Sequence, residues 1–214
     1  SFSKYVDVQN TYDLADLDKV LQTLPEGEHR IQPATGKPLD KVPASSFSGS
    51  ESARTGINGL SIADDVTMVI VPDLVTAATK NGTVDETLWK TVQIALVNHC
   101  EGQGNRMAIL DSPPTKKSPQ DVKAWREAVG YSSAYGALYY PWIEVDNPAA
   151  EKNDKQTIMV PPSGHMAGIW ARTDDTRGVW KAPANEVVRG ALSVETPVNS
   201  AEQGQLNPIG VNCI

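Results

Sequence analysis

Two short, almost wholly apolar runs constrain the fold of this chain more than any other feature. The first is Val66–Val71, followed by Pro72 and Asp73, and the second is Met107–Leu110, followed by Asp111. An unbroken apolar run of this length is typical of a strand that is buried on both faces of a parallel sheet. We therefore expect both runs to be strands of one covered sheet.

The chain between the two runs predicts an amphipathic helix over Asp85–Cys100. Gly102 and Gly104 follow at its end, where glycine commonly stops a helix. Five side chains at helical spacing form the expected apolar face: Leu88, Val92, Ala95, Leu96 and His99.

A second helix is expected from Ser118. The Ser118 side chain can cap it, Pro119 suits the first helical position, and Asp121 favours the positive end of the helix dipole. Its apolar residues are Val122, Trp125 and Val129.

Ala137–Val145 predicts a third strand, in which Pro141 indicates an edge or a bulge. A polar loop over Asp146–Gln156 follows, and a further helix is expected up to about Thr173. Strand and helix therefore alternate as in a βαβ series. The predicted fold class is α/β, with a mostly parallel central sheet flanked by helices.

The beginning of the chain has a different pattern. Phe2–Val8 alternates as a short strand would, and Tyr12–Leu24 is an acidic amphipathic stretch that Pro25 stops. Residues 25–50 predict a long loop, and Ser50–Leu60 is expected to be helical. We therefore expect an N-terminal segment over 1–49, at the edge of an outer or N-terminal domain, and the α/β domain over 50–214.

Composition excludes several classes of function. The 214 residues carry a net charge of −7, which argues against a nucleic-acid surface, because phosphate binding needs clustered Lys and Arg. No apolar run approaches the length of a membrane span, so membrane insertion is not expected. Cys100 and Cys213 are too few for a disulfide scaffold and are interpreted as free thiols.

Motifs for cofactors and metals are missing from the sequence. No phosphate-binding P-loop occurs, and the glycines of Glu101–Asn105 follow a helix rather than a strand. The three histidines and two cysteines lack metal-ligand spacing. Asp73 and Asp111 follow strands, where ligands collect in open α/β sheets. The favoured interpretation is that each acid caps local backbone amides beside a proline.

One segment is similar to part of a protease. Ser163–Gly168 resembles the run around the catalytic histidine of subtilisin-like proteases, which would make His165 the base. A triad also needs a nucleophilic serine, and Ser193 and Ser200 lack the glycine-rich setting of one. We expect no catalytic activity. A subtilisin-like serine hydrolase, or its inactive relative, is the alternative hypothesis.

A longer resemblance points elsewhere. Val160–Asn185 closely resembles the signature of contractile-tail sheath proteins, which runs from Pro-Pro-Ser-Gly through Ala-Arg-x-Asp to Arg-Gly-Val-Trp-Lys-Ala-Pro-Ala-Asn. Four other segments are similar to segments of the same family: Arg54–Leu60, Arg106–Asp111, Ser132–Trp142 and Leu206–Asn212. The resemblance covers roughly residues 50 to 214.

The resemblance implies a subtilisin-like domain that is used without catalytic residues. It implies a structural subunit that stacks in helical rings around a tail tube and shortens to drive the tube through a cell envelope. The implied partners are neighbouring sheath subunits and the tail tube, baseplate and tail terminator proteins. The implied location is a virion tail sheath or a phage-tail-like particle that is assembled in the bacterial cytoplasm. The chain would be a fragment that lacks the N-terminal arm and the C-terminal domain.

Within the signature, each residue type has a structural reading. Pro161 and Pro162 stiffen the entry to the helix, and Ser163 can cap it. Gly164 and Gly168 permit close approach of the helix to a neighbour. The charged residues at the end of the helix form a cluster: Arg172, Asp174, Asp175 and Arg177. Gly178 is expected to be left-handed, and Trp180 and Pro183 to anchor the stretch that follows. This stretch is either a loop pinned inside the domain or a junction between rigid bodies. The candidate assembly residues are Pro161, Pro162, Gly164, Gly168, Arg172, Asp174, Arg177, Gly178, Trp180 and Pro183.

Overall fold

A computed structural model describes residue 39 and residues 42–152 and 154–214 of the chain. These residues belong to one compact unit that spans 37–214. The elements predicted at Phe2–Val8 and Tyr12–Leu24 lie outside the described residues.

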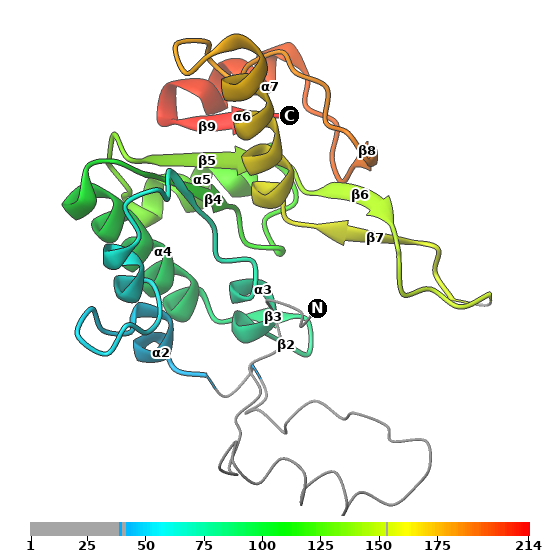
Figure 1. Cartoon of the computed structure of the whole chain (residues 1–214). Helices are drawn as coiled ribbons and strands as arrows, with labels where there is room; N and C mark the ends of the chain where they lie inside the picture. Colours follow the sequence, from blue (N-terminus) through cyan, green and yellow to red (C-terminus); the bar gives the residue numbers. More distant parts are fainter. Residues whose placement is uncertain (1–38, 40–41, 153) are drawn as a thin grey trace, which may run out of the picture. The chain divides into compact units, whose positions relative to one another are not determined.

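A parallel four-stranded sheet forms the centre of the domain (Figure 1). Its order is β1-β4-β5-β9, and each neighbouring pair is parallel. The strands are β1 (Met68–Val69), β4 (Met107–Asp111), β5 (Gly136–Tyr140) and β9 (Val211–Cys213). The predicted fold class is therefore confirmed.

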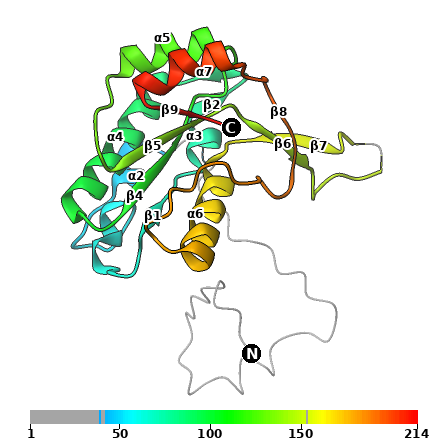
Figure 2. The same cartoon turned by 90° about the horizontal axis from the view of Figure 1, so that it is seen from above.

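Helices cover both faces of this sheet, as Figure 2 shows from above. Successive residues of β4 point to opposite faces, as in any strand. Ala108 and Leu110 belong to the core beneath α4 (Glu86–Gln103) and α5 (Pro119–Val129). Ile109 belongs to a second core, which it shares with Met166 and Ile169 of α6 (Ser163–Arg177) on the other face.

The helix ends follow the local sequence. Asp85 caps α4 by accepting a hydrogen bond from the Leu88 N–H at 2.9 Å, and Gly104 ends the helix with φ 70°. Ser118 and Asp121 form a capping box at α5. Both predicted helices are confirmed. Shorter elements complete this unit: α3 (Leu74–Ala78), β2 (Thr79–Lys80), β3 (Thr83–Val84), α7 (Ser200–Leu206) and η4 (Asn207–Ile209).

The first predicted strand is wrong in extent and in burial. Only Met68–Val69 pairs, and it pairs with β4 alone at one end of the sheet order. Val69 is buried, while Val66 and Val71 are half-buried. The apolar side chains on either side of Met68–Val69 pack against the two cores, but their backbone adds no further residues to the strand.

The helix predicted over Ser50–Leu60 is also wrong. The chain there forms turns, with a bridge between Ser50 and Thr55, and then the 3-10 helix η3 (Asn58–Ile62). Arg54 and Gly56 have positive φ values of 54° and 58°, which an α-helix does not allow. The predicted loop over 25–50 contains α2 (Ala44–Ser48), which packs on the core, so the compact unit begins before residue 50.

Pro141 separates two strands that the sequence joined into one. β5 ends at Tyr140, and β6 (Ile143–Asp146) belongs to a different, antiparallel sheet. Proline has no N–H to continue a ladder, so the chain leaves the parallel sheet there instead of forming an edge or a bulge. The second sheet has the order β7-β6-β8, with β7 (Thr157–Val160) and β8 (Ala191–Val194) on either side of β6. Figure 1 shows β6 and β7 projecting away from the parallel sheet.

α6 leads back from β7 to the parallel sheet and ends at Arg177, four residues beyond the predicted Thr173. In the part of the chain that the structure describes, no helix has both the length and the apolar character to cross a membrane.

Candidate assembly site

The start of α6 is held by a carboxylate from the parallel sheet. The Ser163 N–H donates a hydrogen bond to Asp111 Oδ1 at 2.8 Å, across 52 positions of sequence. Pro162 occupies the N-cap, and no side chain of the cap residue bonds there, so the prediction that Ser163 caps the helix is wrong. Asp111 does not cap local amides either, because it bonds to a helix far along the chain. The carboxyl end of β4 is thereby joined to α6.

Burial changes the acidity of this carboxyl group. Removal from water raises the pKa of Asp111 to about 7, although hydrogen bonding from Ser163 acts in the opposite direction. Other hydrogen bonds fix the same strand end. Gln93 Nε2 donates to the Asp111 carbonyl at 2.8 Å, and Trp142 Nε1 donates to the Ser112 carbonyl at 2.9 Å. The strand end is thus tied to α4 and to the start of the second sheet.

Sequence reasoning gave no structural role to the buried guanidinium of Arg106. Arg106 is 2% exposed, and its Nη1 and Nη2 atoms each donate at 2.8 Å, to the carbonyls of Leu60 and Ala63. Its Nε donates to Asn105 Oδ1 at 2.9 Å. Burial and the Arg106 charge together lower the pKa of nearby His99. The available signal was a charged residue placed directly before the apolar run Met107–Leu110.

The glycines of α6 do not meet a neighbour among the described residues. Gly164 and Gly168 are exposed, and a Cβ atom added to either would have no atom within 4 Å. The predicted close packing against this thin face is therefore absent from this part of the chain. Pro162 is buried and Pro161 half-buried at the helix entry, as expected for a stiff turn.

The predicted charged cluster at the end of α6 is not formed as a unit. Arg172 turns to the segment that follows, donating from Nη2 to the Val187 carbonyl at 2.9 Å and lying 3.7 Å from a carboxylate oxygen of Glu186. The side chains of Asp174 and Arg177 are exposed. Arg172 therefore pins the chain beyond the helix to the helix itself.

Gly178 has the positive φ that was expected, 92°, but its ψ of 157° is not that of a left-handed helix. A Cβ atom there would lie 2.3 Å from Trp180 Cη2, so a side chain at this position would displace the exposed ring. Trp180 itself is 85% exposed. The prediction that Trp180 anchors the stretch inside the domain is therefore wrong, whereas Pro183 is half-buried.

Pro183 lines a groove of about 630 Å³ beside the last strand of the parallel sheet. One wall comes from α6, through Met166 and Trp170, and another from β9, through Asn212. Trp170 Nε1 donates to the Tyr139 hydroxyl at 2.9 Å along this wall. The lining is mainly apolar and amide, with Glu186 as its carboxylate and Cys213 as its thiol.

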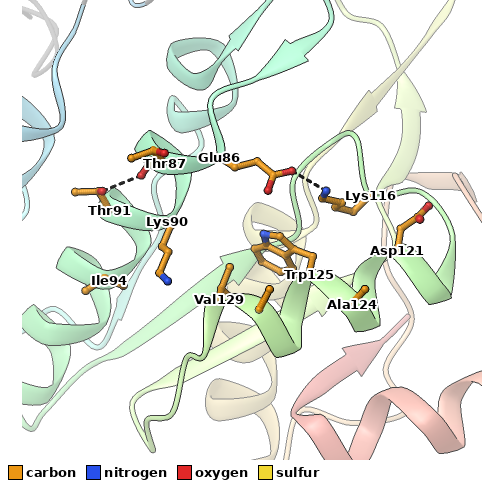
Figure 3. Close-up of a pocket in the computed structure, with 11 residues that line it drawn as sticks. Glu86, Thr87, Lys90, Thr91, Ile94, Lys116, Asp121, Ala124, Trp125 and Val129 are labelled. Carbon is orange, nitrogen blue, oxygen red and sulfur yellow. Dashed lines mark hydrogen bonds and ion pairs between the residues drawn. The ribbon is translucent and has the colours of Figure 1, made fainter.

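A second groove, of about 580 Å³, lies between α4 and α5 (Figure 3). Lys116 Nζ and Glu86 Oε1 form an ion pair across it at 2.6 Å, and Trp125 lies below this pair in the view of Figure 3. The remaining lining consists mainly of threonine, alanine and aliphatic side chains. Its polar groups serve local structure: Thr91 Oγ1 donates to the Thr87 carbonyl at 2.8 Å, and Asp121 belongs to the capping box of α5.

His165 does not belong to a catalytic triad in the described residues. Its ring is half-buried, and Nε2 lies 4.0 Å from the position that a Cβ atom of Gly190 would take. Ser193 Oγ instead faces the carbonyl of Val194 at 3.4 Å, and Ser200 begins α7. Across residues 42–152 and 154–214, no group of three His, Cys, Asp or Glu side chains is arranged to hold a metal ion.

Comparison with known proteins identifies the chain's relatives. The family model of the phage tail sheath protein central domain matches residues 62–214. A tail sheath protein of Salmonella phage ViI is 36% identical over 64 residues, which are 30% of this chain and 10% of that protein.

Two solved structures are similar to the chain. The sheath complex of an extracellular contractile injection system, PVC, in the contracted state is 27% identical with a TM-score of 0.50, over 72% of this chain and 37% of that one. The contracted helical sheath of the anti-feeding prophage is 34% identical with a TM-score of 0.45, over 60% and 32%. The chain thus spans about a third of the length of these sheath structures. Because the family model covers well over half of it, the chain belongs to the phage tail sheath protein family.

Proposed function

We propose that this chain is the central domain of a structural subunit that polymerises around a tail tube and contracts to drive the tube through a cell envelope. The observation that carries this proposal is the match to the sheath central domain over residues 62–214. The likeness to a sheath complex in the contracted state supports the contractile role.

The architecture suits a part that moves as a rigid body. Two hydrophobic cores lie on opposite faces of one sheet, and β4 contributes to both. Buried hydrogen bonds tie the end of β4 to α4, to α6 and to the second sheet. A domain braced in this way transmits a rotation to its neighbours without changing its own packing.

The proposed partners follow from the same role. Neighbouring sheath subunits would be the main ones, and the tail tube, baseplate and tail terminator proteins would contact the ends or the inside of the sheath. The proposed location is the tail sheath of a virion or a phage-tail-like particle, after assembly in the bacterial cytoplasm. In this role, the domain acts as a scaffold and not as an enzyme.

Electron microscopy of the full-length protein tests the proposal. The protein that contains this chain, produced with and without its tube protein, should form tubes or rings in negative stain. Protein that stayed monomeric under all conditions, with and without the tube, would contradict the proposed function.

A further inference from the structure

Asparagine is followed directly by glycine at two places in the chain, Asn58–Gly59 and Asn81–Gly82. Asparagine is among the chemically labile residues, and glycine after it has no side chain to hinder attack of the backbone nitrogen on the asparagine amide carbon. The structure places the two pairs in different surroundings. Whether either pair reacts therefore depends on the freedom of its backbone.

Asn81 and Gly82 form the tip of an exposed hairpin. They are the two loop residues between β2 and β3, where Lys80 pairs with Thr83. Their φ values of 50° and 76° are both positive, as in a type I′ turn. Both residues are exposed, and a Cβ atom on Gly82 would have no atom within 4 Å. β2 and β3 are so short that this tip should open at little cost in free energy.

The nitrogen of Gly82 is free to react in this loop. Among the residues that the structure describes, no backbone carbonyl accepts a hydrogen bond from the Gly82 N–H. The loop is also open to water, because exposed hairpin tips carry little packing of their own. The nucleophile and the amide carbon of Asn81 therefore belong to neighbouring residues that nothing in the described residues holds apart.

The other pair, Asn58 and Gly59, is held far more tightly. Gly59 is buried in η3, and its N–H donates to the Thr55 carbonyl at 2.9 Å. The carbonyl of the next residue, Leu60, accepts from the buried Arg106 at 2.8 Å. The Gly59 nitrogen can reach the Asn58 side chain only if this packed region opens, which costs far more free energy than opening a hairpin tip.

We propose that Asn81 is a site of spontaneous deamidation, with water as the co-reactant. The Gly82 nitrogen forms a bond to Asn81 Cγ, and the bond between Cγ and Nδ2 breaks. Nδ2 leaves as ammonia with the proton from Gly82, so a cyclic imide remains. Water then adds to either carbonyl carbon of the imide and opens the ring, which leaves an aspartyl or an isoaspartyl residue.

Both products change the hairpin. A carboxylate in place of the neutral amide adds a negative charge at the tip, a few residues before Asp85, the cap of α4. The isoaspartyl product also passes the backbone through the former side chain, so the loop gains a carbon atom. A two-residue type I′ loop has no place for this atom, because its backbone geometry is set by the twist of the two strands.

Mass spectrometry of the folded 214-residue chain tests the proposal. The chain is incubated at mildly alkaline pH, which favours loss of the Gly82 proton, and is digested at acidic pH, which stops further ring closure. Asn81 should gain the mass difference between an amide and an acid at least about tenfold faster than Asn58. Aspartyl and isoaspartyl peptides should both appear, because water opens the imide on either side.

The chain unfolded in guanidinium chloride is the matched control. Both pairs are free there, so Asn58 and Asn81 should convert at similar rates. Gly82→Ala adds a methyl group beside the attacking nitrogen and should slow conversion of Asn81 several-fold in both states, while Asn58 converts as before. Asn81→Asp supplies the reference for the aspartyl product in ion-exchange chromatography.

Four results would overturn the proposal. Asn81 that stays intact in the folded chain but converts in the unfolded chain would show that the hairpin protects it. Equal conversion of Asn58 and Asn81 in the folded chain would refute the role of the two surroundings. An aspartyl product alone, or a Gly82→Ala variant that converts as fast as the wild type, would refute attack by the Gly82 nitrogen. The proposed sheath function would stand in each case.

Discussion

The N–H of Ser163 and the Oδ1 atom of Asp111 lie 2.8 Å apart, which joins the first turn of α6 to the end of β4. The strand β4 contributes side chains to both hydrophobic cores, whereas α6 packs only in the second. The hydrogen bond therefore joins α6 to the strand that the two cores share. It also places a titratable group inside the domain.

Asp111→Asn should change how stability depends on pH. The pKa of Asp111 is raised from 3.8 to about 7, so between these values the folded state keeps a proton that the unfolded state releases. Stability should therefore fall as pH rises through this window and level off above about 7. The full effect is on the order of 4 kcal/mol.

Asparagine can still accept from Ser163 but does not titrate, so Asp111→Asn should gain stability relative to the wild type as pH rises from 5 to 8. Urea unfolding at each pH measures this difference. The lowered pKa of His99 makes stability rise with pH, in the direction opposite to Asp111. The contributions of His99 and of the other titratable groups are the same in both proteins and cancel in the comparison. A difference between the two proteins that stayed constant with pH would contradict the prediction.

Arg106→Ala should destabilise the domain by about 3 kcal/mol or more, because it leaves buried carbonyls at Leu60 and Ala63 without donors. The exposed Arg177→Ala is the control and should change stability by less than about 0.5 kcal/mol. Urea unfolding measures both variants. Equal effects would show that Arg106 is not a structural clamp.

Glycine substitutions at two sites should act in opposite directions. Gly168→Ala, in mid-helix with no atom within 4 Å, should stabilise the chain by about 0.5–1 kcal/mol. Gly178→Ala, at φ 92° and under the Trp180 ring, should destabilise it by about 1 kcal/mol or more and shift the Trp180 ring. Thermal unfolding and near-UV circular dichroism check the pair, and a stabilised Gly178→Ala would refute the turn geometry described at this position.

Local sequence predicted the parts of the fold that depend on local chemistry. The starts of α4 and α5 were predicted correctly because Asp85 and Ser118 cap neighbouring backbone N–H groups, whereas α4 continues through Gly102 to Gln103, three residues beyond the predicted Cys100. The alternation of helices and apolar runs was enough to predict a parallel sheet that helices cover on both faces.

Contacts between residues that lie far apart in the sequence could not be predicted in the same way. Ser163 looks like a cap in sequence, but Asp111 reaches the same N–H from another strand, and no local pattern reports that contact. The sequence left open whether Trp180 pins its stretch inside the domain, and in the structure this side chain is 85% exposed. Packing across the whole domain likewise decides the order in which strands pair. It therefore decides that β5, before Pro141, and β6, after it, belong to different sheets.

A serine-reactive fluorophosphonate probe distinguishes the scaffold from the hydrolase alternative. The geometry predicts no labelling, because in the described residues His165 has no serine or acid partner in hydrogen-bond contact. Labelling that His165→Ala abolished would instead establish a catalytic serine and refute the scaffold role.

Electron cryomicroscopy of full-length protein assembled on its tube, before and after contraction, tests the central claim most directly. The account predicts a sheath that shortens while residues 42–214 keep one internal structure, with the bond between Ser163 and Asp111 present in both states. Particles without a sheath, or a domain whose α6 separates from β4 on contraction, would contradict it.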